Sequence, residues 1–172
     1  MFRVPRNCRF EIDDIEKEWT WSLRFCYIRL SFLAGAINVE GAIVQAFRHL
    51  ELGGRFEAID IDYIPRCENG TLEGTKLYKF MHLLLEASKK SERPLNCALQ
   101  YEGWMEKANF DDVQRTHHRR WIQTRWDFEW LQGLCLRYFT RYLGWNSDKV
   151  MALCAEVSAE LKSQSVAVYF DL

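Results

Sequence analysis

Two short segments near the start of the chain have the hydrophobic pattern of β-strands. Residues 9–12 alternate polar and apolar side chains and are followed by a turn signal at Asp13-Asp14. Residues 25–30 are mostly apolar, which is the composition of a strand that is covered on both faces. We therefore predict a short strand at 9–12 and a buried strand at 25–30.

A helix and a further strand are predicted next. Residues 39–50 place four apolar side chains at the spacing of one helix face: Ile43, Ala46, Phe47 and Leu50. Gly53-Gly54 is a helix stop signal, and residues 56–61 then have a strand pattern that is lost at Pro65. Strand, helix, glycine turn and strand within about forty residues are typical of a β-α-β unit in a parallel sheet. The sequence therefore predicts an α/β fold.

The rest of the chain adds helices and two short strands. Residues 72–90 form a long predicted helix with one apolar face, made of Leu77, Phe80, Met81, Leu84 and Ala87. The elements expected after it are a short helix at 104–108, a strand within 113–122, an aromatic segment at 126–142 that is buried on more than one side, a helix that begins at Asn146-Ser147, and a closing strand at 165–172.

Composition and charge limit the classes of partner. The 172 residues are 48% hydrophobic, 15% aromatic and 27% charged, and the net charge is -1. This balance supplies a core and gives no bulk charge for general nucleic-acid binding or for an acidic membrane surface. The six cysteines show no C-x-x-C spacing, so we expect reduced thiols, no metal site, and a cytoplasmic or nuclear location.

Several segments together resemble one protein family. They are VPRNCRFEIDD at 4–14, EKEWT at 16–20, AFRHLELGGRFE at 46–57, ANFDDV at 108–113 and YFTRYLGW at 138–145. In this colinear order they resemble the fungal LaeA-like methyltransferases, S-adenosylmethionine-dependent proteins of secondary metabolism. The resemblance extends over about residues 4–172.

The resemblance implies a particular fold. It implies a truncated class I methyltransferase sheet (Rossmann-like) that lacks its first two strands and is flanked by helices, in a single partial domain over residues 1–172. Gly35, Gly41 and Gly53-Gly54 do not have the E/D-x-G-x-G-x-G spacing of the loop that holds the cofactor in this fold. In the family's sheet the missing strands lie beside strand 25–30, so we expect its outer edge to be bare.

The resemblance also implies where ligands bind. Asp14 would accept a hydrogen bond from the adenine amino group, and the Ile15 backbone would meet the ring edge; a turn-capping Asp-Asp is the alternative.

Five further residues are expected to contact the substrate. Fold analogy assigns this role to Asp60, Asp62 and Tyr63, which end a strand on the ligand side, and a pocket near Arg29, Tyr63 and Trp104 is a further possibility. Arg29 stands where the family's strand has His, and no catalytic residue is assigned.

The functional hypothesis is a truncated S-adenosylmethionine-dependent methyltransferase-like protein of fungal secondary metabolism that is impaired in cofactor binding. One alternative is a non-catalytic interaction or regulatory pseudoenzyme, and another is a non-methylating small-molecule enzyme on the same fold. The expected partners are a small-molecule substrate or a protein, including a second copy that pairs with the exposed sheet edge to form a homodimer.

Overall fold

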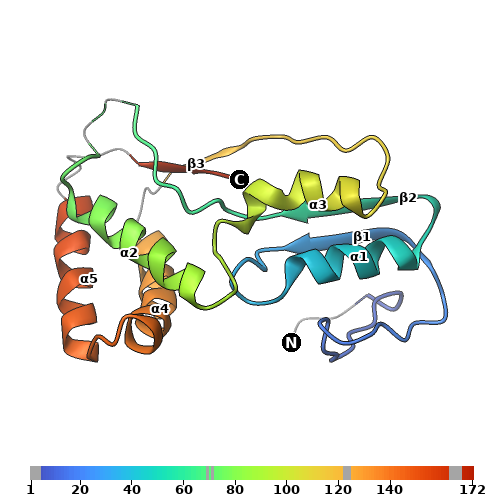
Figure 1. Cartoon of the computed structure of the whole chain (residues 1–172), viewed down its shortest axis with the longest axis horizontal. Helices are drawn as coiled ribbons and strands as arrows, with labels where there is room; N and C mark the ends of the chain where they lie inside the picture. Colours follow the sequence, from blue (N-terminus) through green and yellow to red (C-terminus); the bar gives the residue numbers. More distant parts are fainter. Residues whose placement is uncertain (1–4, 69, 71, 122–124, 163–167) are drawn as a thin grey trace.

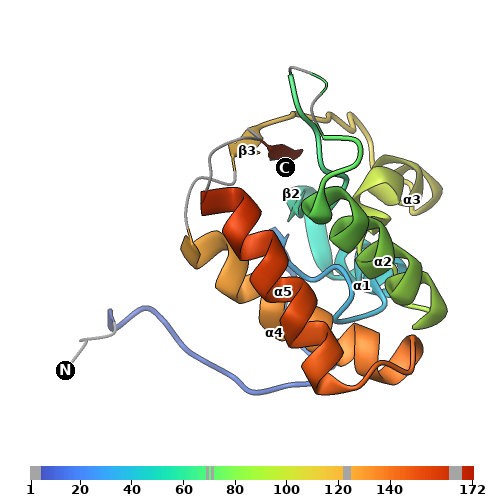
Figure 2. The same ribbon diagram turned by 90° about the vertical axis from the view of Figure 1, so that its left-hand side faces the viewer.

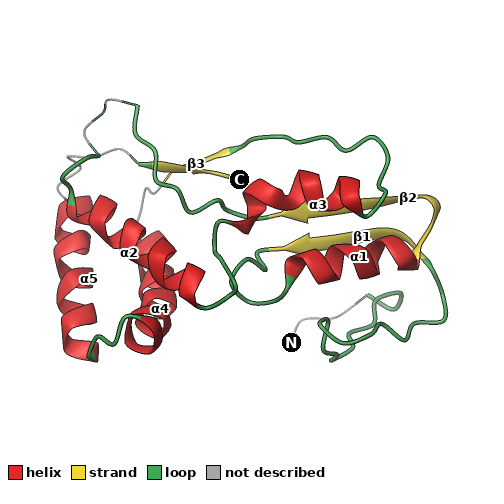
Figure 3. Ribbon diagram, in the orientation of Figure 1, coloured by secondary structure: helices red, strands yellow, loops and turns green. Residues whose placement is uncertain are grey.

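The chain has a helical end and a sheet end (Figure 1). The computed structural model describes residues 5–68, 70, 72–121, 125–162 and 168–172. The helical end consists of α2 (Lys76–Lys90), α4 (Arg125–Tyr142) and α5 (Ser147–Lys162), which pack together in Figure 2. The sheet end contains β1 (Phe25–Ser31), α1 (Val39–His49), β2 (Leu50–Ile59), the 3-10 turn Cys97–Gln100 and α3 (Tyr101–Lys107). A short pair, β3 (Arg119–Trp121) and β4 (Tyr169–Asp171), completes the elements coloured in Figure 3.

The sheet end contains the predicted β-α-β unit. β1 and β2 run parallel, with Ile28 opposite Phe56 and Leu30 opposite Ala58, and α1 is the crossover between them. The side chain of Asn38 accepts a hydrogen bond from the Gly41 backbone N–H and so caps the start of α1. The structure therefore confirms a mixed helix and strand fold with a small parallel sheet.

Gly53-Gly54 does not end the helix, as the sequence predicted, but lies within β2. α1 ends directly at Leu50, which is already extended, and β2 begins there. The pairing then jumps from Phe25 opposite Leu50 to Tyr27 opposite Arg55, so the residues around Gly53-Gly54 bulge out of the strand. Gly53 has a φ of 76°, a conformation that glycine adopts without strain.

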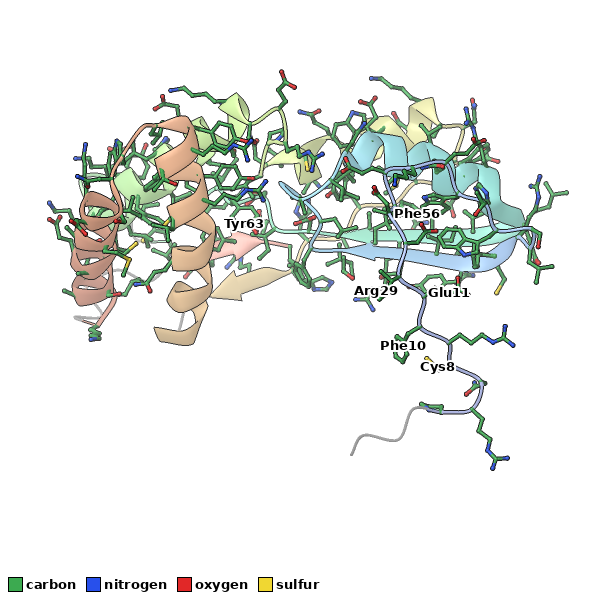
Figure 4. All side chains as sticks on the ribbon, turned by 90° about the horizontal axis from the view of Figure 1, so that it is seen from below. Cys8, Phe10, Glu11, Arg29, Phe56 and Tyr63 are labelled. Atoms are coloured by element: carbon green, nitrogen blue, oxygen red, sulfur yellow. The ribbon has the colours of Figure 1, made fainter. Side chains whose placement is uncertain are left out.

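The strand predicted at 9–12 is wrong. These residues are irregular, and Phe10 is 80% exposed. Their alternating pattern is not sufficient because a strand also needs a neighbour to satisfy its backbone groups, and none of the described strands pairs with them. Figure 4 shows Phe10 and Cys8 pointing away from the rest of the chain.

The expectation that strand 25–30 is buried is also wrong. Of its residues only Leu30 is buried, while Cys26, Tyr27 and Arg29 are exposed. Figure 4 shows α1 on one side of the β1–β2 pair, the side of Phe56, while Arg29 projects on the other. β1 is exposed because a helix layer covers one face only, and because β2 is its only partner strand among the described residues.

The helical end encloses the larger apolar core. The predicted apolar face of α2 is fully buried, as the sequence pattern requires: Leu77, Phe80, Met81, Leu84 and Ala87. The aromatic segment 126–142 is the helix α4, which supplies the buried Tyr138 and Phe139 to this core. Glu160 of α5 accepts hydrogen bonds from the backbone N–H groups of Lys76 and Leu77, at 3.0 and 2.8 Å, and so caps the first turn of α2.

The chain after β2 connects the two ends. The Asp62 N–H donates to the Asp171 carbonyl at 3.2 Å, and Arg66 and Tyr169 exchange two backbone hydrogen bonds of 2.9 and 3.0 Å. β4 therefore lies beside this segment and pairs antiparallel with β3 on its other side. Both strands are shorter than the predicted segments 113–122 and 165–172, and residues 165–167 lie outside the described ones.

Leu84 tests the importance of the helical core. The Leu84→Ala variant should lower the free energy of unfolding by roughly 2–5 kcal/mol, because the side chain is fully buried and its loss leaves a cavity. Leu52→Ala is the matched control, since Leu52 is 104% exposed in the bulge of β2 and should change stability by less than about 0.5 kcal/mol. Urea unfolding followed by circular dichroism measures both, and equal losses would contradict this assignment of the core.

Candidate functional site

A cavity of about 410 Å³ lies at the amino end of α1. It is lined by Glu16, by residues 37–40 after β1, by residues 91–94 after α2, and by Cys97 and Trp104. The segment 37–40 follows the carboxyl end of β1, which is the edge of a parallel sheet where α/β proteins bind ligands. A volume of this size is within the usual range for small-molecule sites, roughly 300–1,000 Å³.

An ion pair joins three segments at this cavity. One Nη of Arg93 lies 3.1 and 2.9 Å from the two carboxylate oxygens of Glu16, and the guanidinium also donates to the Ala36 carbonyl. Glu16 in turn accepts a hydrogen bond of 2.8 Å from the Asn38 N–H. Both charged side chains are partly exposed, so the pair contributes little to stability and mainly fixes the relative position of the segments.

The buried carboxylate of Asp60 holds the loop that leads from β1 toward this cavity. It accepts hydrogen bonds from the N–H groups of Leu33 and Ala34, at 2.9 and 2.7 Å, and from the Tyr101 hydroxyl at 2.9 Å. A fourth, from the Ile61 N–H, is 3.0 Å long. Burial raises the pKa of Asp60, and these hydrogen bonds oppose the shift.

The groups beside Asp60 stay protonated. The Cys97 sulfur lies 3.8 Å from the Tyr101 hydroxyl oxygen. Burial raises the pKa of the Cys97 thiol and the pKa of the Tyr101 phenol, and the negative charge of Asp60 adds to both shifts. A protonated thiol is a poor nucleophile, so this cluster fixes the loop and α3 in place.

Asp62 and Tyr63, two of the predicted substrate contacts, lie in the link between the two ends of the molecule. The Asp62 carboxylate pairs with Arg66 at 2.5 Å, and Arg66 also approaches Asp171 at 3.4 Å. Tyr63 is buried, with its ring 6.4 Å from that of Phe170 (Figure 4). The structure places neither residue on the cavity lining.

Arg29 lies on the open face of the sheet. Its guanidinium is 3.3 Å from Glu57, which also accepts a hydrogen bond of 2.5 Å from the Tyr27 hydroxyl. That hydrogen bond raises the pKa of Tyr27. The structure therefore does not bring Arg29 and Tyr63 to the cavity, and of the five predicted substrate contacts only Trp104 lines it.

Asp14 and Ile15 form a turn that leads to the cavity. Asp14 accepts a hydrogen bond of 3.2 Å from the Glu16 N–H, and its other oxygen lies 3.7 Å from Lys17. The Ile15 carbonyl accepts a hydrogen bond of 3.0 Å from the indole N–H of Trp19. These contacts are those of the turn-capping alternative, while the Asp14 side chain remains about half exposed.

Sequence reasoning missed Glu16 and Arg93. Glu16 directly follows the segment predicted to meet the adenine, so its position was a usable signal. Arg93 had no such signal because its partner lies 77 residues away along the chain. Trp104 and Glu16, the residue that follows the predicted turn at 14–15, thus line one cavity that only the fold assembles.

Comparison with known proteins agrees with the resemblance noted in the sequence. No protein-family model matches the chain. The methyltransferase pytC of Aspergillus terreus is 29% identical over 187 residues, which cover 98% of this chain and 57% of pytC. The chain is thus similar to fungal methyltransferases of the LaeA type.

Two further relatives extend this comparison. The secondary metabolism regulator laeA of Monascus pilosus is 26% identical, over 96% of this chain and 50% of that protein. The protein-methionine methyltransferase laeA of Emericella nidulans is 26% identical, over 96% of this chain and 49% of that protein. The chain therefore spans about half the length of the curated relatives it matches.

The described residues show no sign of two other classes of site. No helix among them combines the length and apolar character that crossing a membrane requires. Within the same residues, no three His, Cys, Asp or Glu side chains are grouped so as to hold a metal ion.

Asp60 provides a test of the loop that borders the cavity. Asp60→Asn should lower the free energy of unfolding at neutral pH by about 1–3 kcal/mol, because an amide N–H₂ would face backbone N–H donors. Since burial raises the pKa of Asp60 above its ordinary 3.8, the folded state binds this proton more tightly than the unfolded chain. The part of the stability that comes from proton binding at Asp60 is therefore fully present at low pH and declines as pH rises through the raised pKa, while the hydrogen bonds from the backbone N–H groups account for the loss at neutral pH.

Urea unfolding of both proteins across this pH window measures the effect. The advantage of the wild type over Asp60→Asn should be largest at the acidic end and should shrink as pH rises. Asp111→Asn, at an exposed carboxylate, is the control and should change stability by less than about 0.5 kcal/mol. A wild-type advantage that grows with pH would contradict the direction of the shift.

Proposed function

We propose that this chain is an S-adenosylmethionine-dependent methyltransferase-like protein of fungal secondary metabolism. The proposal is supported by the similarity to pytC and laeA, which covers 96–98% of the chain. The methyltransferase names of these relatives do not favour a non-catalytic interaction protein or a non-methylating enzyme. Because the chain spans about half of each relative, methyl transfer is proposed and its acceptor is left open between a small molecule and a protein.

The proposed fold is a partial class I methyltransferase domain over residues 1–172. In it, the parallel β1–β2 pair continues through residues 61–66 to the antiparallel strand β4, with helices beside the sheet. The outer edge of β1 is the place where the first two strands of that fold would lie. The six free cysteines support a cytoplasmic or nuclear location within the same proposal.

The observation that carries the function is the meeting of Glu16 and Trp104 at one cavity. Glu16 follows the turn that the resemblance assigns to the adenine of the cofactor, and Trp104 is a predicted substrate contact. A site that holds cofactor and acceptor side by side performs the main task in methyl transfer, which is to align the nucleophile with the methyl group. When bound, S-adenosylmethionine supplies an electrophilic methyl group on a sulfonium.

The chain's own residues fit part of the cofactor. The half-exposed carboxylate of Asp14 can accept a hydrogen bond from an adenine amino group, and its nearest cation, Lys17, is 3.7 Å away. Trp104 offers an apolar wall to the acceptor, and the Glu16–Arg93 pair holds the segments around it. With the adenine contact alone, cofactor binding should be weak, and we expect little independent activity.

Titration with S-adenosylhomocysteine tests this function. We expect saturable binding with a Kd on the order of a millimolar, the strength that a few contacts provide. Saturation-transfer NMR should show the adenine protons in contact with the protein. Asp14→Ala should weaken binding by roughly tenfold, the equivalent of one charge-assisted hydrogen bond.

Glu18→Ala is the control, since it removes a nearby exposed carboxylate and should leave binding unchanged. Absence of binding at about ten millimolar ligand, roughly tenfold above the expected Kd, by a folded chain would overturn the assignment of the cofactor contact. Micromolar binding that Asp14→Ala weakens would support the methyltransferase function more strongly, because it would require further cofactor contacts.

A further inference from the structure

The outer edge of β1 is open. β2 pairs along one edge of this seven-residue strand, and within the described part of the chain no strand pairs along the other. Natural edge strands are usually protected by a proline, a bulge or an inward-pointing charge. The outer edge of β1 shows none of these, because its single charged residue, Arg29, projects from the sheet face and pairs with Glu57. Its free backbone N–H and C=O groups can therefore template another strand.

Exposed apolar side chains accompany this edge. Leu23 precedes β1 and is 79% exposed, and Phe32 follows it and is half exposed. Tyr27, in the middle of the strand, is half exposed as well. A second chain that pairs with β1 would remove part of this exposed apolar surface from water.

We propose that β1 pairs antiparallel with β1 of a second copy of the chain, about a two-fold axis, so that the order β2-β1-β1-β2 forms one continuous sheet. The inference does not depend on methyl transfer. A register centred on Ile28 pairs all seven residues of both strands and places Arg29 of each copy opposite Tyr27 of the other.

Charge complementarity selects this register. Tyr27 and Arg29 lie on the same face, and Glu57 contacts both within one copy. In the proposed pair each guanidinium meets an aromatic ring whose hydroxyl is held by a carboxylate, which is a favourable cation–π arrangement. A register shifted by two residues in one direction would place Arg29 opposite Arg29 of the other copy. A shift by two residues in the other direction would place Arg29 opposite Phe25, and each shifted register leaves only five residues of β1 paired.

The antiparallel direction also joins the exposed apolar ends. In the register centred on Ile28, the start of β1 in one copy, which Leu23 precedes, lies beside the end of β1 in the other, which Phe32 follows, and this occurs twice. A parallel pair would place each of these residues beside its own equivalent and would bring Arg29 next to Arg29. The two-fold arrangement is therefore the one that satisfies both the apolar ends and the charges.

Pairing along this edge requires the amino-terminal segment to move. Figure 4, which looks from the side of this edge, shows the segment passing in front of the β1–β2 pair before Glu11, Phe10 and Cys8. It makes no backbone hydrogen bond to β1 among the described residues, and Glu11 is held by one hydrogen bond of 3.1 Å from the indole of Trp21. The firm attachment of the segment begins at Ile15 and Glu16, beyond the part that would move.

The molecular mass in solution tests the pairing. Multi-angle light scattering and sedimentation velocity of the wild type should show a concentration-dependent dimer, twice the mass of the 20.5 kDa chain. Tyr27→Lys should raise the dimer Kd by about tenfold or more, because each new lysine would face Arg29 of the other copy. The variant should stay folded, since position 27 is half exposed and the new lysine can pair with Glu57. Met151→Lys on α5 is the control, with a matched exposure of 51% against 50%, and should leave the dimer unchanged.

A charge exchange tests the register itself. In a Glu57→Gln background, which removes the carboxylate that would repel a glutamate at position 29, adding Arg29→Glu to Tyr27→Lys should restore the dimer, because only the register centred on Ile28 places the new lysine opposite the new glutamate. The shifted registers would instead oppose two lysines or two glutamates. Hydrogen exchange adds a readout that needs no variant: the β1 amides should become more protected as wild-type concentration rises.

Three results would overturn the proposal. They are a wild type that remains monomeric at high concentration, a dimer that Tyr27→Lys and Met151→Lys affect equally, and, in the Glu57→Gln background, a dimer that stays as weak after Arg29→Glu is added to Tyr27→Lys. Capture of a strand from a different protein, with the wild type alone monomeric, would likewise show that the edge does not serve a second copy.

Discussion

The buried carboxylate of Asp60 determines how the sheet end of this protein is arranged. It sits where β2 ends and gathers the N–H groups of Leu33 and Ala34 and the hydroxyl of Tyr101. These groups come from the loop after β1 and from α3, so one side chain sets the relative position of both. The cavity depends on this arrangement, because its lining includes residues 37–40 and Trp104, which continue from the same two elements.

A one-sided sheet is the second constraint. α1 and α3 pack against one face, where Phe56 and Ala58 join their apolar cluster. The opposite face carries Tyr27, Arg29 and Glu57, whose polar contacts with one another suit a surface in water. A parallel sheet is normally covered on both faces, whereas the described residues cover this sheet on one face.

The cavity and the open sheet edge belong to different parts of the molecule. The cavity lies beside the amino end of α1, whereas the open edge belongs to the outer side of β1. The residues that line the cavity form none of the strand contacts proposed between two copies. The proposed pairing through β1 therefore uses none of the residues that line the cavity, although it moves the segment that ends at Asp14.

The sequence alone determined the β-α-β unit, the apolar face of α2 and the resemblance to LaeA-like methyltransferases. Each of these depends on the spacing of residues within one segment or on short motifs in a fixed order, and both can be seen in the sequence. The tertiary structure decided the rest. Residues 9–12 have a strand pattern and no partner, β1 lacks a second layer, and Asp62 with Tyr63 turned into the core. Arg93 reached Glu16 across 77 residues. Strand pairing and side-chain burial depend on which distant segments pack together. The hydrophobic periodicity of a single segment does not specify its neighbours in the fold.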